Sequence, residues 1–349
     1  MPVVCLGPLC APVPDVRRIA VLRGGGLGDL LFAMPAIDSL ALAYPDAEIT
    51  LVGTALHRDL LSGRPGSVRE VLVIPQPESE EEFFADVGPF DLAVQLHGGG
   101  RWSNPFLRRL GARCTVGPNT PDAVPLDRPA PFTYFQNETM RWLEVVGFAG
   151  APVAALEPSI AVTEADLAEA SAALSGLPRP IVTVHPGATD PRRRWPHFAE
   201  LIGGLSERAG VVVIGTESER PLLDDLPART LTQLSMSGLV GVLASSAVVV
   251  ANDSGPRHLA QAVGAQTVSI YWMGNVINAG PAGRARHGVH ISWTARCPVC
   301  GADCTRHDLG RCEHDASIVA DVPVADVLAD VLCRLPSSGR PQWTTSHPA

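Results

Sequence analysis

The chain has 349 residues, of which 46% are hydrophobic and 18% charged, and this composition is typical of a soluble globular protein rather than a disordered one. The length predicts two domains, each with its own hydrophobic core. A formal net charge of −9 argues against a nucleic-acid-binding protein that relies on bulk positive charge, although local arginine clusters can still bind a small anion.

Targeting signals are not evident in the sequence. No apolar run approaches the roughly 20 residues of a membrane span, and prolines interrupt an N-terminus that lacks the basic start of a secretory signal. Eight cysteines in a chain of this length do not indicate a secreted disulfide scaffold. We therefore expect a cytoplasmic protein without a transmembrane segment and without a nucleic-acid partner, and peripheral contact with a membrane stays open.

The N-terminal half shows a first series of alternating strands and helices. Residues 18–23 predict a strand, a glycine-rich turn follows, and a helix then extends to about Tyr44. Further strands are predicted at 48–53, 69–74 and 91–96, before a proline-rich stretch over 118–131 and a helical segment over 134–148. Short β-rich runs that alternate with helices predict a parallel sheet in an α/β layer fold.

The C-terminal half shows a second and clearer series. Strands are predicted at 180–185, 211–215, 247–252 and 266–272, with helices between them and a late amphipathic helix over 323–335. A helix over 164–174 precedes this series, and residues 176–180 are interpreted as the interdomain linker. The predicted domains are therefore 1–160 and 175–335, followed by a disordered tail over 336–349.

The glycine-rich turn from Gly24 to Asp29 joins the first strand to a helix. A dinucleotide-binding fingerprint needs a third glycine where Asp29 stands and an acidic residue near the end of the second strand, which here ends in Gly53 and Thr54. Both requirements fail, which argues against a Rossmann oxidoreductase. Asp29 lies at a helix start, where free N–H groups favour a carboxylate, so it is either a helix cap or a catalytic base.

The loop from His185 to Pro196 leaves the carboxyl end of a predicted strand, where open α/β sheets bind ligands. Its neighbouring residues Arg193 and Arg194 suit a diphosphate, because guanidinium groups form bidentate charge-assisted bonds to phosphate oxygens. A solvated basic loop is the alternative interpretation.

The stretch 252–258 follows a buried strand and opens a helix, with Asp253 or Ser254 as the cap. The free N–H groups of Ser254 and Gly255 would face an anion. Such a cap is common in α/β proteins, and His258 taken alone is more typical of a structural histidine.

An acidic turn after another strand contains Glu217 and Glu219. A carboxylate at this place either holds ribose hydroxyls or complements the dipole of the next helix.

Four cysteines lie within sixteen residues of one another near two histidines, and these are Cys297, Cys300, Cys304 and Cys312 with His307 and His314. Thiols this close can hold structural zinc, but the spacing is not that of a standard zinc-ribbon pair. The sequence favours reduced structural thiols or a local disulfide, and we predict no metal in the chemistry.

Three stretches, taken together and in this order, resemble glycosyltransferase family 9, the ADP-heptose:lipopolysaccharide heptosyltransferase family. They are RIAVLRGGGLGDLLFAMPAIDSLALAYPDAEITLVG, VTVHPGATDPRRRWPHFAEL and VVVANDSGPRHLAQAVGAQTVSIY. The resemblance spans roughly residues 17–335. It implies the α/β GT-B fold, in which two Rossmann-like domains face a central cleft with the acceptor on the N-terminal domain and the nucleotide sugar on the C-terminal domain.

The resemblance also implies an activity. The chain would be an inverting, metal-independent glycosyltransferase without a cofactor, which transfers heptose from ADP-heptose to a hydroxyl of a glycan, a lipid-linked acceptor such as the lipopolysaccharide core, or a natural product. The absence of a D-x-D motif agrees with metal independence. Two alternatives stay open, namely a GT-B enzyme with another nucleotide-sugar donor and a non-catalytic nucleotide-sugar-binding protein.

The resemblance assigns roles by motif position. Asp29 corresponds to the general base, and Arg193 replaces the family's usual lysine at the donor phosphates. The donor-binding residues are expected to be Arg193, Arg194, Glu217 (with Glu219 as second choice), Asp253, Ser254, Gly255 and His258. The loops on the acceptor side are expected to contribute Gly26, Gly28, His97 and Arg101.

Overall fold

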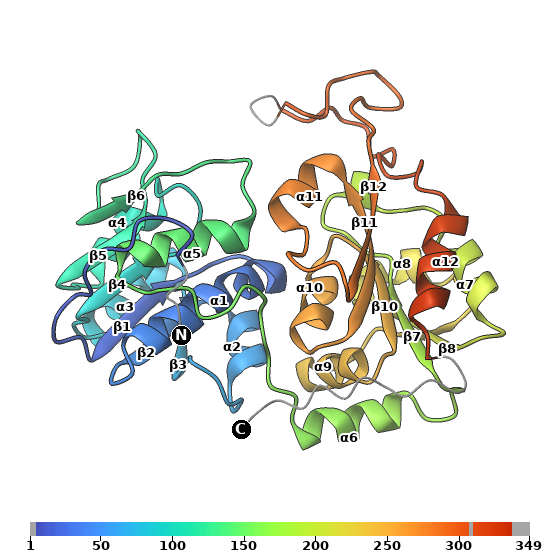
Figure 1. Ribbon diagram of the computed structural model, residues 1–349, viewed down its shortest axis with the longest axis horizontal. Coiled ribbons are helices and arrows are strands. Elements are labelled where there is room, and N and C mark those ends of the chain that lie inside the picture. The colour runs from blue at the N-terminus through green and yellow to red at the C-terminus, as the bar shows by residue number, and fades with distance from the viewer. Residues whose placement is uncertain (1–4, 307–309, 337–349) are drawn as a thin grey trace. The chain divides into compact units, whose positions relative to one another are not determined.

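The computed structural model describes residues 5–306 and 310–336, and the chain divides into two compact units (Figure 1). The first unit extends to Thr163 and includes the short stretches Gln261–Val263 and Gly274–Ala282, and the second contains the rest of the described chain. The tail predicted over 336–349 lies, except for its first residue, outside the described residues. Within the described chain, no helix combines the length and the hydrophobicity that a membrane crossing requires.

The first unit is built on a parallel six-stranded sheet with the order β3-β2-β1-β4-β5-β6. Its strands are β1 (Arg18–Leu22), β2 (Glu48–Gly53), β3 (Glu70–Val73), β4 (Leu92–Gln95), β5 (Cys114–Pro118) and β6 (Arg128–Ala130). The four strands predicted in this half are confirmed, whereas β5, which ends at the first residue of the proline-rich stretch, and β6, which lies within it, were not predicted. This strand order is that of a Rossmann fold.

Helices cover both faces of this sheet (Figure 1). They are α1 (Leu27–Ala43), α2 (Ala55–Leu61), α3 (Glu80–Asp86), α4 (Ser103–Arg109) and α5 (Glu138–Phe148), with a 3-10 turn η1 (Pro77–Ser79). Ala20 and Leu22 of β1 pack with Phe106 of α4. Because side chains alternate along a strand, Ile19 and Val21 point to the other face, where α1 packs against α5.

The second unit repeats this architecture with the strand order β12-β11-β10-β7-β8-β9, again all parallel. Its strands are β7 (Ile181–His185), β8 (Gly210–Ile214), β9 (Arg229–Leu231), β10 (Val248–Asn252), β11 (Gln266–Trp272) and β12 (His287–Ser292). The four strands predicted in this half are confirmed.

The helices that accompany the second series are α6 (Glu164–Ala173), α7 (Phe198–Leu205), α8 (Arg220–Leu223), α9 (Met236–Ala244), α10 (Gly255–Ala262), α11 (Met273–Ala279) and α12 (Val324–Arg334), with 3-10 turns η2 (Pro191–Arg193) and η3 (Glu217–Glu219). Placing the linker at 176–180 was wrong, because α6 belongs to the second unit. It packs on α9 so closely that a side chain at Gly241 would collide with the backbone carbonyl of Asp166.

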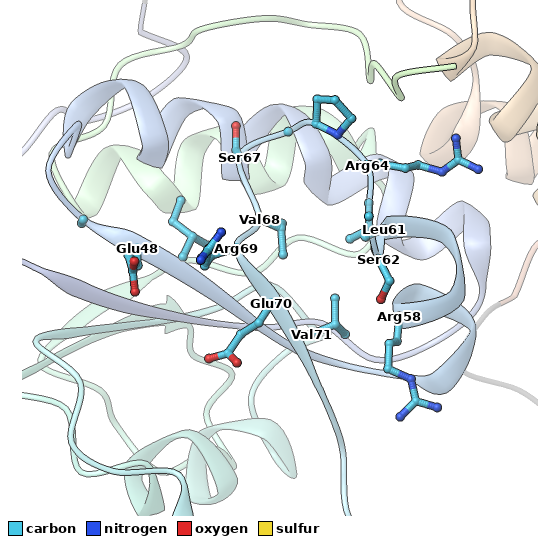
Figure 2. Close-up of a pocket in the computed structure, with 15 residues that line it drawn as sticks. Glu48, Arg58, Leu61, Ser62, Arg64, Ser67, Val68, Arg69, Glu70 and Val71 are labelled. Atoms are coloured by element: carbon cyan, nitrogen blue, oxygen red, sulfur yellow. The ribbon is translucent and has the colours of Figure 1, made fainter. Parts of the chain in front are cut away.

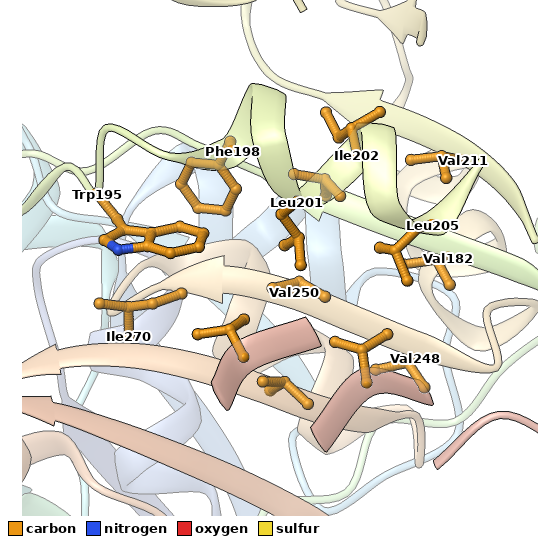
Figure 3. Packing of buried hydrophobic residues seen from close by; sticks show 14 of the residues in the cluster. Val182, Trp195, Phe198, Leu201, Ile202, Leu205, Val211, Val248, Val250 and Ile270 are labelled. Carbon is orange, nitrogen blue, oxygen red and sulfur yellow. The ribbon is translucent and has the colours of Figure 1, made fainter. Parts of the chain in front are cut away.

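The core of the second unit lies between α7, α12 and the sheet. Figure 3 shows Trp195 and Phe198 packed with Leu201 over Val250 and Ile270 of the central strands. The strands β7, β8 and β10 are buried along their whole length, which explains why their sequences are mostly apolar.

In each sheet the strand order reverses at one point, between β1 and β4 in the first unit and between β7 and β10 in the second. Open α/β sheets bind ligands just beyond the carboxyl ends of the strands at such a point. The loops that follow these four strands are therefore where a site is expected in each unit.

Candidate functional site

In the first unit, the carboxylate of Asp29 lies beyond the carboxyl end of β1. Its Oδ2 accepts a hydrogen bond of 2.8 Å from the backbone N–H of Gly26, and its Oδ1 lies 2.8 Å from Nη2 of Arg23. The side chain of Asp29 is 48% exposed, so both oxygens can accept a further proton donor from solution. Asp29 is thus a helix cap with an accessible carboxylate.

Arg23, which was not predicted from the sequence, holds this carboxylate in place. It is 2% exposed, and it donates through Nε to the carbonyl of Asp29 at 2.7 Å and through Nη1 to that of Leu96 at 2.7 Å. Its Nη2 also lies 3.0 Å from Oε2 of Glu138, and its guanidinium lies 5.0 Å from the ring centre of Trp142. The signal in the sequence was an arginine directly after the apolar run from Ile19 to Leu22.

Two of the three consecutive glycines make room for these side chains. Gly25 has φ +93°, and a β-carbon there would lie 2.5 Å from Oδ2 of Asp29. A β-carbon at Gly24 would lie 3.2 Å from Cε1 of His97. The glycine run therefore allows both the carboxylate and an imidazole to approach the backbone.

The predicted acceptor-side residues do not form one group. His97 follows β4, and burial, followed by the charge of Arg23, lowers its pKa. Gly26 is the N-cap of α1, and Gly28 lies in its first turn. Arg101 is 85% exposed and is 3.8 Å from the carboxylate of Asp122, so it lies in solvent rather than with Asp29 and His97.

In the second unit, Asp253 joins two of the predicted donor-binding residues. Its Oδ2 lies 3.0 Å from Nη1 of Arg193 and its Oδ1 lies 3.1 Å from Nε2 of His258. Burial alone would raise the pKa of Asp253, but the hydrogen bond from His258 and the charges of His258, Arg193 and Arg257 bring it below the ordinary value. Asp253 is therefore an ionised group that orients Arg193.

The ends of three neighbouring strands meet at His185. Its Nδ1 lies 3.0 Å from Oγ of Ser254, and its Nε2 lies 3.7 Å from Oε1 of Glu219. The interaction with His185 is the first of those that lower the pKa of Glu219 to about 2. A side chain at Gly187 would collide with the carboxylate of Glu219, so the loop after β7 lies directly against it.

Glu217, the first choice for the nucleoside-binding acid, is engaged by Arg220 and by the two residues that follow β9. Its carboxylate accepts bonds from Arg220 at 2.8 and 2.9 Å, from Thr232 at 2.5 Å and from Gln233 at 3.1 Å. These bonds, that of Arg220 foremost, lower its pKa to about 2. Of the two acids, Glu219 is the one that contacts the loop after β7.

Trp195 anchors the arginine-rich loop on the core. Its backbone N–H donates to Oδ1 of buried Asn252 at 3.1 Å, and its indole N–H donates to the carbonyl of Val322 at 2.9 Å. Asn252 in turn donates to the carbonyl of Pro186 at 2.7 Å. The loops after β7 and β10 are thereby fastened together, with Arg193, Arg194 and Ser254 presented beyond the strand ends.

The cysteine-rich segment gathers a set that differs from the one expected. One cluster contains Cys297, Cys300, Cys312 and His314. Cys304 lies outside this cluster and packs against the core. All eight cysteines are free thiols.

A separate pocket of about 670 Å³ lies in the first unit at the amino ends of β2 and β3. Figure 2 shows the charged side chains of Glu48, Arg58, Arg69 and Glu70 around it. Since the strands are parallel, this pocket is at the opposite edge of the sheet from Asp29.

Comparisons with known proteins agree on one family. The sequence model of glycosyltransferase family 9 (heptosyltransferase) matches residues 129–300. Lipopolysaccharide heptosyltransferase 1 of Pseudomonas aeruginosa is 24% identical over 310 residues, which cover 81% of this chain and 86% of that protein.

Solved structures agree on the fold. The structure of Escherichia coli ADP-heptose lipopolysaccharide heptosyltransferase II superimposes with a TM-score of 0.73 and 20% identity, covering 91% of this chain and 98% of that one. Escherichia coli heptosyltransferase WaaC with ADP gives a TM-score of 0.61 and 20% identity, covering 79% and 93%. The predicted GT-B class, with two Rossmann-like units, is confirmed. The chain is a glycosyltransferase whose residues 129–300 match the model of glycosyltransferase family 9, and its similarity to curated and solved heptosyltransferases supports that family.

Proposed function

We propose that this glycosyltransferase transfers heptose from ADP-heptose to a hydroxyl of a glycan acceptor, with inversion at the anomeric carbon and without a metal or other cofactor in the chemical step. The names of the relatives support the donor, since one similar protein is a lipopolysaccharide heptosyltransferase and another has been solved with ADP. The acceptor belongs to the class of lipopolysaccharide cores, other lipid-linked glycans or glycosylated natural products.

The observation that carries the proposal is the half-exposed carboxylate of Asp29, held by Arg23 and the N–H of Gly26 at the switch point of the first sheet. A general base must be ionised, oriented and open to the proton that it accepts. In the proposed step, Asp29 takes the proton of the acceptor hydroxyl while that oxygen forms a bond to the anomeric carbon.

The bond that breaks joins the anomeric carbon to the β-phosphate oxygen, and its electron pair leaves with ADP. Arg193, Arg194 and the N–H groups at the start of α10 are assigned to this developing charge. Arg193 uses one nitrogen on Asp253, and the rest of its guanidinium fork can bind phosphate oxygens. This cationic set supports leaving-group stabilisation without a metal.

Attack opposite to the leaving group inverts the anomeric centre, because one carboxylate acts as base and no glycosyl-enzyme forms. The expectation that both units face a common cleft stays a prediction.

Thermal-shift measurements with ADP, UDP, GDP and NAD test the donor, because selective binding to the folded state raises the melting temperature. We expect ADP to give the largest shift. A larger shift with UDP or GDP would mean that the donor carries that nucleotide instead of ADP. A larger shift with NAD would contradict the assignment of the phosphate loop to a nucleotide sugar.

Product analysis tests the reaction itself. Purified protein, ADP-heptose and a lipopolysaccharide-core acceptor should release ADP and give a heptosylated product whose anomeric configuration, read by NMR coupling constants, is opposite to that of the donor. Retention would contradict the single displacement. Stoichiometric ADP binding without turnover on any tested acceptor would favour the non-catalytic alternative.

A further inference from the structure

A cluster of three thiols and one imidazole lies in the second unit, outside the residues assigned to the donor. Cys297, Cys300, Cys312 and His314 each offer one ligand atom, and these atoms all lie within 4.8 Å of one another. Tetrahedral zinc with bonds of about 2.0–2.3 Å spaces its ligand atoms roughly 3.5–4 Å apart, so small side-chain movements would complete its coordination. We propose that this cluster binds one structural zinc ion.

The backbone around Cys297 and Cys300 forms a compact knuckle. Cys297 donates its N–H to the carbonyl of Ala302 at 2.8 Å, and Gly301 donates to the carbonyl of Cys297 at 2.9 Å. Gly301 has φ +71°, a left-handed conformation that favours glycine. The turn thus closes on itself and keeps the first two thiols close together.

His314 supplies an independent observation. Its Nδ1 is buried and has no hydrogen-bond partner among the residues that the structure describes. A buried imidazole nitrogen without a partner is costly. A metal ion bound at Nδ1 would remove this cost.

The ligand set decides the chemical class of the ion and its role. Three cysteines and one histidine form a closed tetrahedral set, which is typical of structural zinc, and thiolates disfavour magnesium and calcium. All four positions are protein ligands, so none is left for a substrate. The ion would therefore take no part in the chemical step, and its assignment does not depend on the proposed heptosyl transfer.

The segment 311–318, which contains Cys312 and His314, contacts the arginine-rich loop of the donor site. Nη1 of Arg311 lies 3.3 Å from Oδ1 of Asp190, and Oγ of Ser317 donates to the carbonyl of Arg194 at 2.7 Å. The N–H of Ile318 donates to the carbonyl of Arg192 at 2.8 Å. Zinc at the cluster would fix this segment and so position the loop that presents Arg193.

Elemental analysis of the full-length protein, purified under reducing conditions, tests the site. We expect about one zinc per chain, lost in Cys300→Ser and in Cys312→Ser. Cys304→Ser is the matched control, because Cys304 lies in the same segment but outside the cluster, and this variant should retain zinc. Loss of zinc in Cys304→Ser as well would contradict the assigned ligands.

A second measurement does not depend on whether the variants fold. Cobalt added to the zinc-depleted wild-type protein should give the visible bands and thiolate charge-transfer absorption of a tetrahedral cobalt–thiolate centre, and zinc should abolish both. If the reduced protein contains no bound metal and gives no such cobalt spectrum, the proposed site is wrong. About one iron per chain in place of zinc would overturn the assignment of the ion.

Discussion

Asp29 and Glu138 share one guanidinium nitrogen, because Nη2 of Arg23 lies 2.8 Å from the carboxylate of Asp29 and 3.0 Å from that of Glu138. Arg23 is buried and contacts both carboxylates. If one carboxylate were lost, the guanidinium would therefore still be paired with the other. The two carboxylates differ in position, since Asp29 is 48% exposed and Glu138 23% exposed. The proposed mechanism therefore assigns the catalytic role to the more exposed Asp29 and a structural role to Glu138.

Asp29→Asn should lower turnover by roughly two to four decades, the usual effect of losing a general base. Asparagine can still accept the hydrogen bond from Gly26 and cap α1, so the fold and the affinity for ADP should persist. The measurement is turnover and nucleotide affinity on one preparation of the variant. Near-normal turnover would leave Asp29 as a helix cap only.

Glu138→Gln is the matched control for that variant. It also removes one carboxylate from Arg23, and we expect a loss of stability of similar size in the two variants, measured by thermal unfolding. Turnover should fall far less in Glu138→Gln than in Asp29→Asn. Equal losses of turnover would mean that the state of Arg23, rather than the proton acceptor, controls the rate.

Arg193→Ala should weaken binding of ADP by roughly one to two decades, since a hydrogen bond to a charged group contributes about 1.5–3 kcal/mol. Arg193→Lys keeps the positive charge opposite Asp253 and should recover much of this affinity. Calorimetric titration with ADP distinguishes the two variants. Unchanged affinity in Arg193→Ala would remove Arg193 from the donor site.

Gly187→Ala tests the contact between the loop after β7 and Glu219. The added β-carbon would overlap the carboxylate of Glu219 and lie 3.0 Å from Cε1 of His185, so one of them must move. We expect a destabilisation of about 1–3 kcal/mol together with weaker ADP binding.

Gly203→Ala is the control for that overlap. Gly203 lies in α7, and a β-carbon there would meet nothing within 4 Å. Replacing a helical glycine by alanine should stabilise the protein by up to about 0.5–1 kcal/mol and leave ADP binding unchanged. A similar loss of ADP binding in both variants would contradict a local effect at Glu219.

The sequence was sufficient to predict a strand where burial leaves a mostly apolar run of residues. The predicted strands at 48–53 and 266–272 coincide with β2 and β11. By contrast, β6 and β9 are three-residue strands, β6 lies within the proline-rich stretch, and β12 contains two histidines and a glycine. Such strands are defined by pairing with a neighbour, which the local sequence does not encode.

The candidate site shows the same difference between residues in local motifs, which the sequence predicted, and residues with distant partners, which it did not. The predicted site residues lie in local motifs that follow strands, and they include Asp29, Arg193 and Ser254. Arg23 was missed because its partner Glu138 is 115 residues away in the chain. His314, rather than Cys304, completes the thiol cluster, and spacing along the chain could not distinguish between them.

His287 predicts how stability depends on pH. Burial, followed by the charges of Arg257, Arg286 and Arg334, lowers its pKa to about 4, from 6.5 for an unperturbed histidine. Below pH 6.5 the unfolded chain therefore binds a proton that the folded chain does not. The free energy of unfolding should fall between pH 6.5 and about 4, by up to about 3 kcal/mol from this residue.

His287→Asn removes this titration and retains a polar group that can replace Nδ1 in its 3.0 Å contact with Oγ1 of Thr267. Urea unfolding of the wild type and the variant between pH 7.5 and 4.5 measures the difference. Above pH 7 the variant should lose at most the stability of one hydrogen bond, about 1 kcal/mol. Towards pH 4.5 the two free energies should converge or cross, because only the wild type loses stability through His287. Parallel curves over the whole range would show that His287 takes up its proton in the folded state as readily as in the unfolded chain.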